Sequence, residues 1–217
     1  MGESMTYEGL RIKLRRNYIK LTAKNRRKKI NNTDFTIISN NCWGGFVYQS
    51  YGIPYNTPTI GMFFMAEDYI KFISNMKEYL KNKLEFIDPE KSHSYELIKN
   101  KNNFGTYPIG CLGDIEIHFL HYKTPEEARE KWERRTKRIN YNKILYKFND
   151  QNACTEELLK KFSEMPLKNK ICFTCKEYNL KDTICIKQPK RYEQIQASYE
   201  PFGKSKYINI NDLINKL

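Results

Sequence analysis

The stretch that decides the fold covers residues 36–64 and reads TIISNNCWGGFVYQSYGIPYNTPTIGMFF. It opens with a β-branched apolar run, passes through a polar, glycine-rich turn into a short helix-like segment, and closes with a second apolar run at residues 59–64. A strand that leads through a turn into a helix is typical of α/β proteins, where ligands are usually held at the carboxyl end of the strand. We therefore expect the chemistry of this chain at the turn around Cys42.

Outside this stretch, strand-like and helix-like patterns alternate. Apolar residues at helical spacing predict a helix at residues 66–80. Thr124 as cap, Pro125 at the first helical position and Glu127 three residues after the cap predict a helix at residues 124–139, and further helices are expected at residues 155–162 and 211–217. Shorter apolar runs predict strands at residues 84–87, 114–122, 144–148, 171–174 and 183–186. Residues 88–103 are polar and rich in Lys and Asn, which indicates a variable surface excursion with a solvated His93. The alternation predicts a three-layer α/β/α fold with a largely parallel sheet, as one domain over residues 31–217.

The positive charge is concentrated near the N-terminus. The chain carries a formal net charge of +13, and residues 11–30 contain ten Lys or Arg and no acid. Apolar residues recur there near helical spacing: Leu10, Leu14, Tyr18 and Leu21. Residues 1–30 are therefore expected to form a basic amphipathic leader, in which residues 7–29 can lie on an anionic membrane surface. The alternative is a solvated, partly frayed helix. Nucleic-acid binding has no motif behind it and is not expected.

Two further features bear on location and cofactors. No apolar run approaches the roughly eighteen residues that span a bilayer, and the N-terminus lacks the apolar core of a secretory signal. We expect a cytoplasmic protein with reduced thiols, attached peripherally to the inner face of the membrane if the leader binds there. The Cys172/Cys175 pair lies in a strand-like run, and the sequence has no second CxxC pair that could complete a metal site. These two cysteines are therefore expected to pack in the core. Dinucleotide and P-loop motifs are missing from the sequence, so no cofactor is expected.

Cys42 is the candidate nucleophile. It precedes a helix-like segment, and a helix N-terminus or a nearby imidazolium lowers the pKa of a thiol. Alternation along residues 114–122 places Asp114, Glu116 and His118 on one strand face, so His118 would be the base and Asp114 would orient it. The alternatives are a buried Cys42 at a strand–helix junction and an exposed polar strand face. His118 and His121 lack a second set of ligands, so no metal is expected.

Substrate contacts are expected on both sides of this dyad. The glycine pair after Cys42 leaves backbone N–H groups accessible for an oxyanion or a phosphate. The helix at 124–139 carries several Arg side chains around Trp132, which suits a phosphate-bearing substrate, although a solvated face that ends in cations fits the same residues. The expected substrate-binding residues are Asn40, Asn41, Trp43, Gly44, Gly45, Tyr55, Glu116, His121, Arg134, Arg135 and Arg138.

Six segments in order carry a resemblance to a known family. They read SNNCWGG, GIPYNTPTIGMFF, AEDYIKF, YPIGCLGDIEIHFLHY, EEAREKWERRTKRIN and KNKICFT. The series resembles the bacterial domain of unknown function 1919 family over residues 29–186. Members of that family are often labelled exopolysaccharide or capsular polysaccharide biosynthesis proteins, and the resemblance implies a three-layer α/β fold. A second resemblance, to papain-like cysteine hydrolases, maps only Cys42 and His118 and lacks an Asn or Asp partner on a following strand.

These observations predict an enzyme of surface polysaccharide biosynthesis that acts on an activated or lipid-linked sugar. Cys42 and His118 would carry out acyl transfer or hydrolysis, which requires the thiol and a ring nitrogen within about 4 Å of each other. One alternative is a glycosyltransferase of the same pathway, with Asp114 and Glu116 as acid, base or metal ligands. The other is a non-catalytic binding or scaffold protein of polysaccharide assembly.

Overall fold

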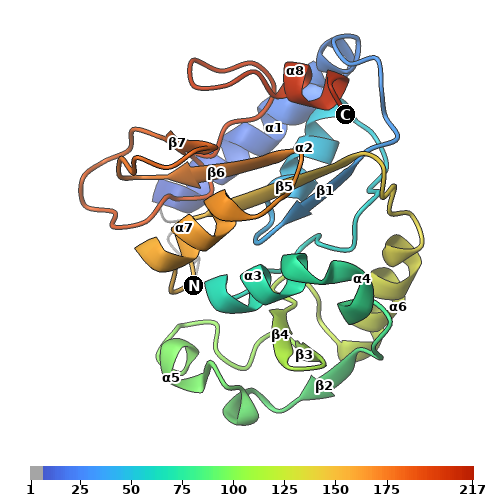
Figure 1. Cartoon of the computed structure of the whole chain (residues 1–217), viewed down its shortest axis with the longest axis vertical. Helices are drawn as coiled ribbons and strands as arrows, with labels where there is room; N and C mark the ends of the chain where they lie inside the picture. Colours follow the sequence, from blue (N-terminus) through green and yellow to red (C-terminus); the bar gives the residue numbers. More distant parts are fainter. Residues whose placement is uncertain (1–6) are drawn as a thin grey trace, which may run out of the picture.

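The main sheet of the protein consists of four parallel strands. The computed structural model describes residues 7–217. The strand order is β1-β5-β6-β7, and Figure 1 shows the strands side by side across the upper part of the molecule. Their bounds are β1 (Thr36–Ser39), β5 (Ile144–Asn149), β6 (Lys170–Thr174) and β7 (Thr183–Cys185). A parallel sheet is stable in water only when both of its faces are covered.

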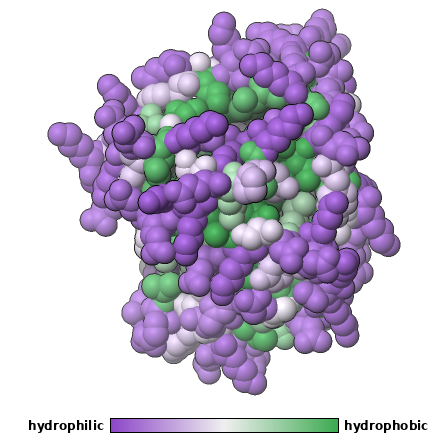
Figure 2. Space-filling view, viewed as in Figure 1, coloured by the Kyte–Doolittle hydropathy of each residue, from purple (hydrophilic) through white to green (hydrophobic). Residues whose placement is uncertain are grey.

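Helices cover the two faces of this sheet. Alternation along β1 sends Ile38 to the side of α3 (Ala66–Ser74) and α7 (Glu156–Glu164). The neighbouring Ile37 faces the side of α2 (Trp43–Tyr51) and α8 (Ile210–Asn215). Figure 2 shows hydrophilic side chains over most of the face that α3 and α7 present. The predicted α/β class and the parallel sheet are confirmed.

A second, antiparallel sheet lies between β1 and β5 in the sequence and was not predicted as a separate unit. It pairs β2 (Glu85–Ile87), β3 (Ile109–Leu112) and β4 (Ile115–His118) in the order β2-β3-β4. The predicted strand at 114–122 ends at His118, because the backbone turns there and Leu120 N donates to the His118 carbonyl at 2.9 Å. The apolar run at 59–64 contributes only the bridge between Phe63 and His118.

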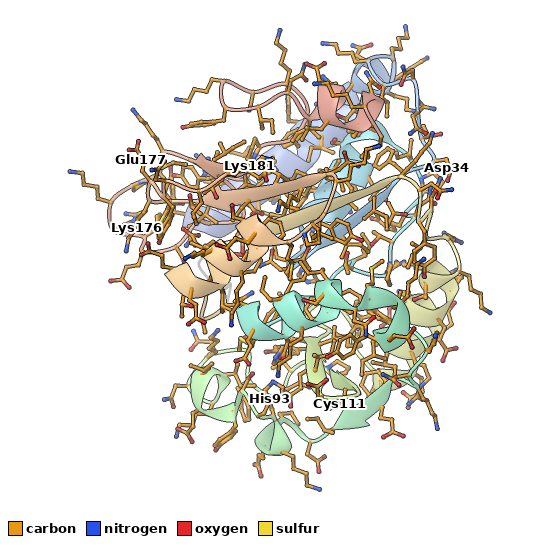
Figure 3. All side chains as sticks on the ribbon, in the orientation of Figure 1. Asp34, His93, Cys111, Lys176, Glu177 and Lys181 are labelled. Carbon is orange, nitrogen blue, oxygen red and sulfur yellow. The ribbon has the colours of Figure 1, made fainter. Side chains whose placement is uncertain are left out.

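The polar excursion after β2 is ordered by short helices. It contains η1 (Pro89–Lys91) and α5 (Tyr95–Ile98). Two of its hydroxyl side chains, Ser92 and Ser94, are buried. Figure 3 shows His93 of this segment below α3. The excursion is therefore packed against α3 and the antiparallel sheet instead of extending into solvent.

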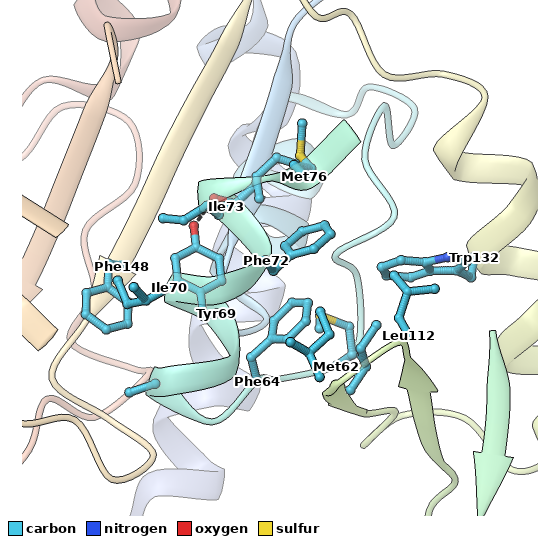
Figure 4. Close-up of a cluster of buried hydrophobic side chains, with 14 of the residues drawn as sticks. Met62, Phe64, Tyr69, Ile70, Phe72, Ile73, Met76, Leu112, Trp132 and Phe148 are labelled. Atoms are coloured by element: carbon cyan, nitrogen blue, oxygen red, sulfur yellow. Dashed lines mark hydrogen bonds between the residues drawn. The ribbon is translucent and has the colours of Figure 1, made fainter. Parts of the chain in front are cut away.

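One hydrophobic cluster joins the two sheets. It includes Ile38 and Phe148 from the parallel sheet and Leu112 and Ile117 from the antiparallel one. Figure 4 shows the side chains of α3 at the centre of this cluster, with Trp132 of α6 (Pro125–Thr136) at its edge. The α3 helix continues into α4 (Met76–Tyr79). The two sheets thus share a continuous core.

The first helix, α1 (Tyr7–Arg27), packs against α2. Ile19 is fully buried, and the Arg26 guanidinium donates to the Ser50 carbonyl at 2.5 Å. Within residues 7–217, no helix combines the length and the apolar composition that a bilayer crossing requires. The predicted leader is therefore helical and, in its described part, attached to the α/β layers.

Candidate functional site

A closed polar network lies at the carboxyl ends of β1 and β5. The Lys147 ammonium forms an ion pair with Glu200 and donates to Asn41 Oδ1 at 2.9 Å. Asn40 Nδ2 donates to Asn149 Oδ1 at 2.7 Å. Lys147 and Glu200 are almost completely buried, and burial lowers the pKa of Lys147 although the Glu200 carboxylate opposes this shift. Asn40 and Asn41, predicted to bind substrate, instead connect the strands to the segment around Glu200.

The glycine turn after Cys42 is tightly packed. Trp43 is buried, and its Nε1 donates to the Pro201 carbonyl at 2.7 Å. A Cβ atom on Gly44 would lie 3.0 Å from Ser39 Oγ, so this position favours glycine. The Gly44 N–H already donates to that hydroxyl at 3.3 Å. Trp43, Gly44 and the buried Gly45 hold α2 against β1.

Cys42 is the cap residue of α2, as the strand–turn–helix pattern predicts. Its Sγ donates to the Met62 carbonyl at 3.7 Å. Burial, and secondarily the Glu200 carboxylate, raise the pKa of Cys42 to about 12. At neutral pH the thiol is therefore protonated, which is unfavourable for a nucleophile.

His118 lies in a different environment from Cys42. Its fully buried ring stacks on Phe63, with 4.5 Å between ring centroids, and meets Tyr107 edge-on. Neither ring nitrogen has a hydrogen-bond partner within the described part of the chain. Burial, followed by the charges of Lys101 and His93, lowers the pKa of His118 to about 3. Cys42 and His118 form no hydrogen bond, so the structure does not bring the predicted dyad together.

Asp114 does not orient His118. It is exposed on the turn before β4, where its Oδ1 accepts from the Tyr79 hydroxyl at 2.7 Å. Its Oδ2 lies 3.6 Å from Lys71 Nζ. The Tyr79 hydroxyl, more than Lys71, lowers the pKa of this carboxyl. Asp114 therefore belongs to a surface cluster.

The predicted arginine site is occupied by contacts within the protein. Arg134 pairs with Glu130 at 3.2 Å. The buried Arg135 donates to the Tyr122 hydroxyl at 2.6 Å and lies over the ring of Tyr55. Arg138 donates to the backbone carbonyl of Tyr55 at 3.4 Å. These contacts attach α6 to neighbouring loops. His121 is exposed on the turn after β4.

A cluster that sequence reasoning missed surrounds His93. Its Nε2 forms a hydrogen bond with Asp68 Oδ2 at 2.9 Å, and its Nδ1 lies 3.4 Å from Glu116 Oε1. The Ser92 hydroxyl donates to Glu116 Oε2 at 2.5 Å. The side chains of Asp68 and Glu116 are 3% and 5% exposed, whereas that of His93 is 49% exposed. Two buried carboxylates thus hold one half-exposed imidazole. Burial raises the pKa of Asp68, and the hydrogen bond from His93 opposes this shift.

His93 and Asp68 line a cavity of about 720 Å³ between α3, α7 and α5. Its polar lining also includes Ser94 and Thr155, together with two ion pairs, Lys71 with Glu67 at 3.6 Å and Lys161 with Glu157 at 3.1 Å. The cavity lies beside the loop after β5, at the edge of the parallel sheet where α/β proteins usually hold ligands.

This loop has an unusual backbone. Asn152 and Ala153 are consecutive non-glycine residues with φ of 57° and 61°, in the left-handed region. Such conformations cost energy and cluster at functional sites. The Asn152 carbonyl accepts from Ala66 N at 2.9 Å, which fixes the start of α3 beside the cavity.

The sequence contained one signal for this cluster. Asp68 lies four residues before Phe72 and eight before Met76, so a carboxylate occupies the buried stripe of α3. A buried carboxylate needs a partner. His93 itself, in a polar segment without periodicity, carried no such signal.

The side chains of the His93 cluster are not arranged as a metal site. Among residues 7–217, no group of three or more His, Cys, Asp or Glu side chains is arranged to hold a metal ion. All six cysteines are free thiols. Cys172 is buried in the core, and Cys175 Sγ donates to the Glu193 carbonyl at 3.1 Å.

Comparison with known proteins identifies the family. Residues 13–217 match the family described as Domain of unknown function (DUF1919). The chain is also 33% identical over 178 residues to an uncharacterised protein of Haemophilus influenzae. This match covers 82% of the present chain and 80% of the Haemophilus protein. Both the glycine turn and the His93 cluster fall within the family match. The chain therefore belongs to the DUF1919 family.

Proposed function

We propose that this protein is an enzyme that acts on an activated or lipid-linked sugar, with His93 as its acid–base group. The observation that carries the proposal is the 2.9 Å hydrogen bond between His93 Nε2 and the buried Asp68, at the wall of the 720 Å³ cavity. A buried carboxylate that orients an accessible imidazole is the arrangement that acid–base catalysis uses.

The two ring nitrogens of His93 have different roles in this proposal. Asp68 engages Nε2 and would stabilise the imidazolium that forms during proton transfer. The 3.4 Å contact of Nδ1 with Glu116 is longer than a normal hydrogen bond, and Glu116 Oε1 already accepts from the His93 backbone N–H at 2.9 Å. In this proposal Nδ1, which has no hydrogen bond of normal length, takes a proton from an attacking hydroxyl or returns one to a leaving group.

The lining of the cavity supports the substrate class. The hydroxyls of Ser94 and Thr155 suit the ring hydroxyls of a sugar. The ammonium groups of Lys71 and Lys161 are paired with Glu67 and Glu157 and would exchange these partners for the phosphates of an activated sugar. The context of exopolysaccharide or capsule assembly, at the cytoplasmic side of the membrane, follows from the family resemblance and is part of the proposal. The reaction would be acyl transfer, glycosyl transfer or hydrolysis with His93, and not Cys42, in the central role.

The test is complementation of a strain that lacks the gene, with surface sugar composition as the readout. We expect wild-type protein to restore the composition, and His93→Gln and Asp68→Asn to fail. The matched controls are His121→Gln, an exposed histidine outside the cavity, and Cys42→Ala. Both should restore the wild-type composition. Immunoblots and thermal melts must show that all variants are folded and equally abundant. Full restoration by His93→Gln would refute the proposal.

A second candidate function is sugar binding without catalysis. The hydrogen bonds of His93 with Asp68 and of Ser92 with Glu116 also attach the excursion to α3 and β4. Such contacts can serve the structure of a binding site alone, which favours this second function. Nucleotide-sugars added to purified protein distinguish the two functions. An enzyme releases nucleotide or transfers the sugar, and loses this turnover in His93→Gln. A binding protein shows only a rise in melting temperature and no turnover in any variant.

A further inference from the structure

Helix α1 has two apolar faces, of which only one is packed. Ile19 is buried against the α/β layers, and Ile12 and Ala23 lie on the same side, half-buried. A second apolar stripe faces solvent, and its exposed fractions are 55% for Tyr7, 42% for Leu10, 60% for Leu14, 57% for Tyr18 and 85% for Leu21. A surface helix needs one apolar stripe to bind its own domain. The second stripe is therefore available to a partner.

The helix is held so that this stripe stays outward. Arg15 donates to the carbonyls of Ala197 and Glu200 at 2.8 and 2.7 Å. Arg26 donates to the Ser50 carbonyl at 2.5 Å. Because these contacts fix both the middle and the end of α1, the helix cannot rotate to bury the stripe against its own domain.

A hollow beside the stripe combines apolar walls with cations. Leu14 and Tyr18 line a groove of about 520 Å³ together with Phe202 and Tyr207 of the C-terminal segment. Lys206 lies at the same groove. An apolar groove with a cationic edge suits an amphiphile with a negatively charged head.

The charge of the chain identifies the class of partner. Residues 7–27 contain eight Lys or Arg and one acid, Glu8. Lys13, Lys20 and Lys24 are exposed on α1. A second copy of this chain would bring the same net charge of +13 to the interface, which disfavours self-association through this face. An anionic lipid surface has the complementary charge.

We propose that α1 docks the protein on an anionic membrane surface. The stripe from Tyr7 to Leu21 enters the headgroup layer, while Lys13, Lys20 and Lys24 contact lipid phosphates. The whole domain is then held in one orientation, because α1 is packed against α2. This inference does not depend on the role of His93.

The test is co-sedimentation of the full chain with lipid vesicles. We expect binding to vesicles that contain phosphatidylglycerol, little binding to phosphatidylcholine alone, and release at high salt. The Leu14→Glu/Leu21→Glu variant should lose binding. Lys20→Gln and Lys24→Gln should each weaken the partition coefficient about fivefold. The matched control is Leu97→Glu, because Leu97 is 54% exposed and lies on α5, away from α1. This control should bind like wild type.

Two outcomes would overturn the inference. One is unchanged vesicle binding by the Leu14→Glu/Leu21→Glu variant when its melting temperature matches that of wild type. The other is the absence of vesicle binding by the wild-type chain together with a dimer, detected by light scattering, that the same variant dissociates. The second result would assign the stripe to a second copy of the chain.

Discussion

At the scale of single residues, His118 makes a direct prediction about stability. Its two ring nitrogens are buried without a hydrogen-bond partner in the described structure, and each such group costs about 1–3 kcal/mol. Phenylalanine keeps the stacking on Phe63 and removes both polar atoms. We expect His118→Phe to raise the free energy of unfolding at pH 7 by about 1–3 kcal/mol, measured by urea denaturation.

The same substitution should change the response to acid. The pKa of His118 is about 3 in the folded protein, below its usual value of 6.5. Between these values the unfolded chain binds a proton that the folded chain refuses, so this group makes stability fall as the pH falls. The loss is about 2 kcal/mol by pH 5 and disappears in His118→Phe. The control variant His121→Gln, changed at an exposed site, should still lose the free energy of unfolding that His118 causes to be lost at acidic pH. If the free energy of unfolding of His118→Phe depended on pH as in the wild type, His118 would not be the group whose lowered pKa causes the loss.

The sequence predicts where side chains stand along the chain better than what they contact. Cys42 was correctly expected at a strand–helix junction, because that depends on local patterns. Its raised pKa was not predictable, since it depends on burial and on Glu200, far away in sequence. The hydrogen bond between His93 and Asp68 spans 25 residues of dissimilar structure and has no periodic signal.

At the scale of elements, α1 offers a matched pair of substitutions on one helix. Ile19 is fully buried, while Leu21 is 85% exposed. We expect Ile19→Ala to lower the free energy of unfolding by about 2–5 kcal/mol, because it removes buried apolar contacts. Leu21→Ala should change it by less than about 0.5 kcal/mol. Denaturant unfolding measures both. Equal, small effects would mean that α1 is a detached leader in solution.

Element predictions succeeded where the determining interactions are local. The helix start at Thr124 followed from its cap sequence, and the Thr124 hydroxyl does accept from Glu127 N at 3.2 Å. The antiparallel sheet was missed because its strands are short and depend on long-range packing. At Gly110, a Cβ atom would approach Leu84 and Phe119 to 2.8 Å, a constraint that only the folded structure reveals.

At the scale of the whole molecule, the shared core predicts a single unfolding transition. The two tryptophans report on different regions, since Trp43 of α2 packs edge-on against Phe173 of β6 and Trp132 of α6 packs edge-on against Phe119, which follows β4. The cluster that contains Trp132 also includes Ile38 and Phe148 of the parallel sheet. Because these contacts cross between the sheets, neither sheet keeps its core when the other unfolds.

The measurement uses two single-tryptophan variants, Trp43→Phe and Trp132→Phe. In each variant, the fluorescence of the remaining tryptophan and the far-ultraviolet circular dichroism are followed through the same urea titration. We expect both probes to give the same midpoint in each variant, since a cooperative domain loses its secondary structure and its core packing together. Separate midpoints within one variant would show that the antiparallel sheet unfolds independently. The His93 cavity, which depends on α3 contacting both sheets, would then form only while both regions are folded.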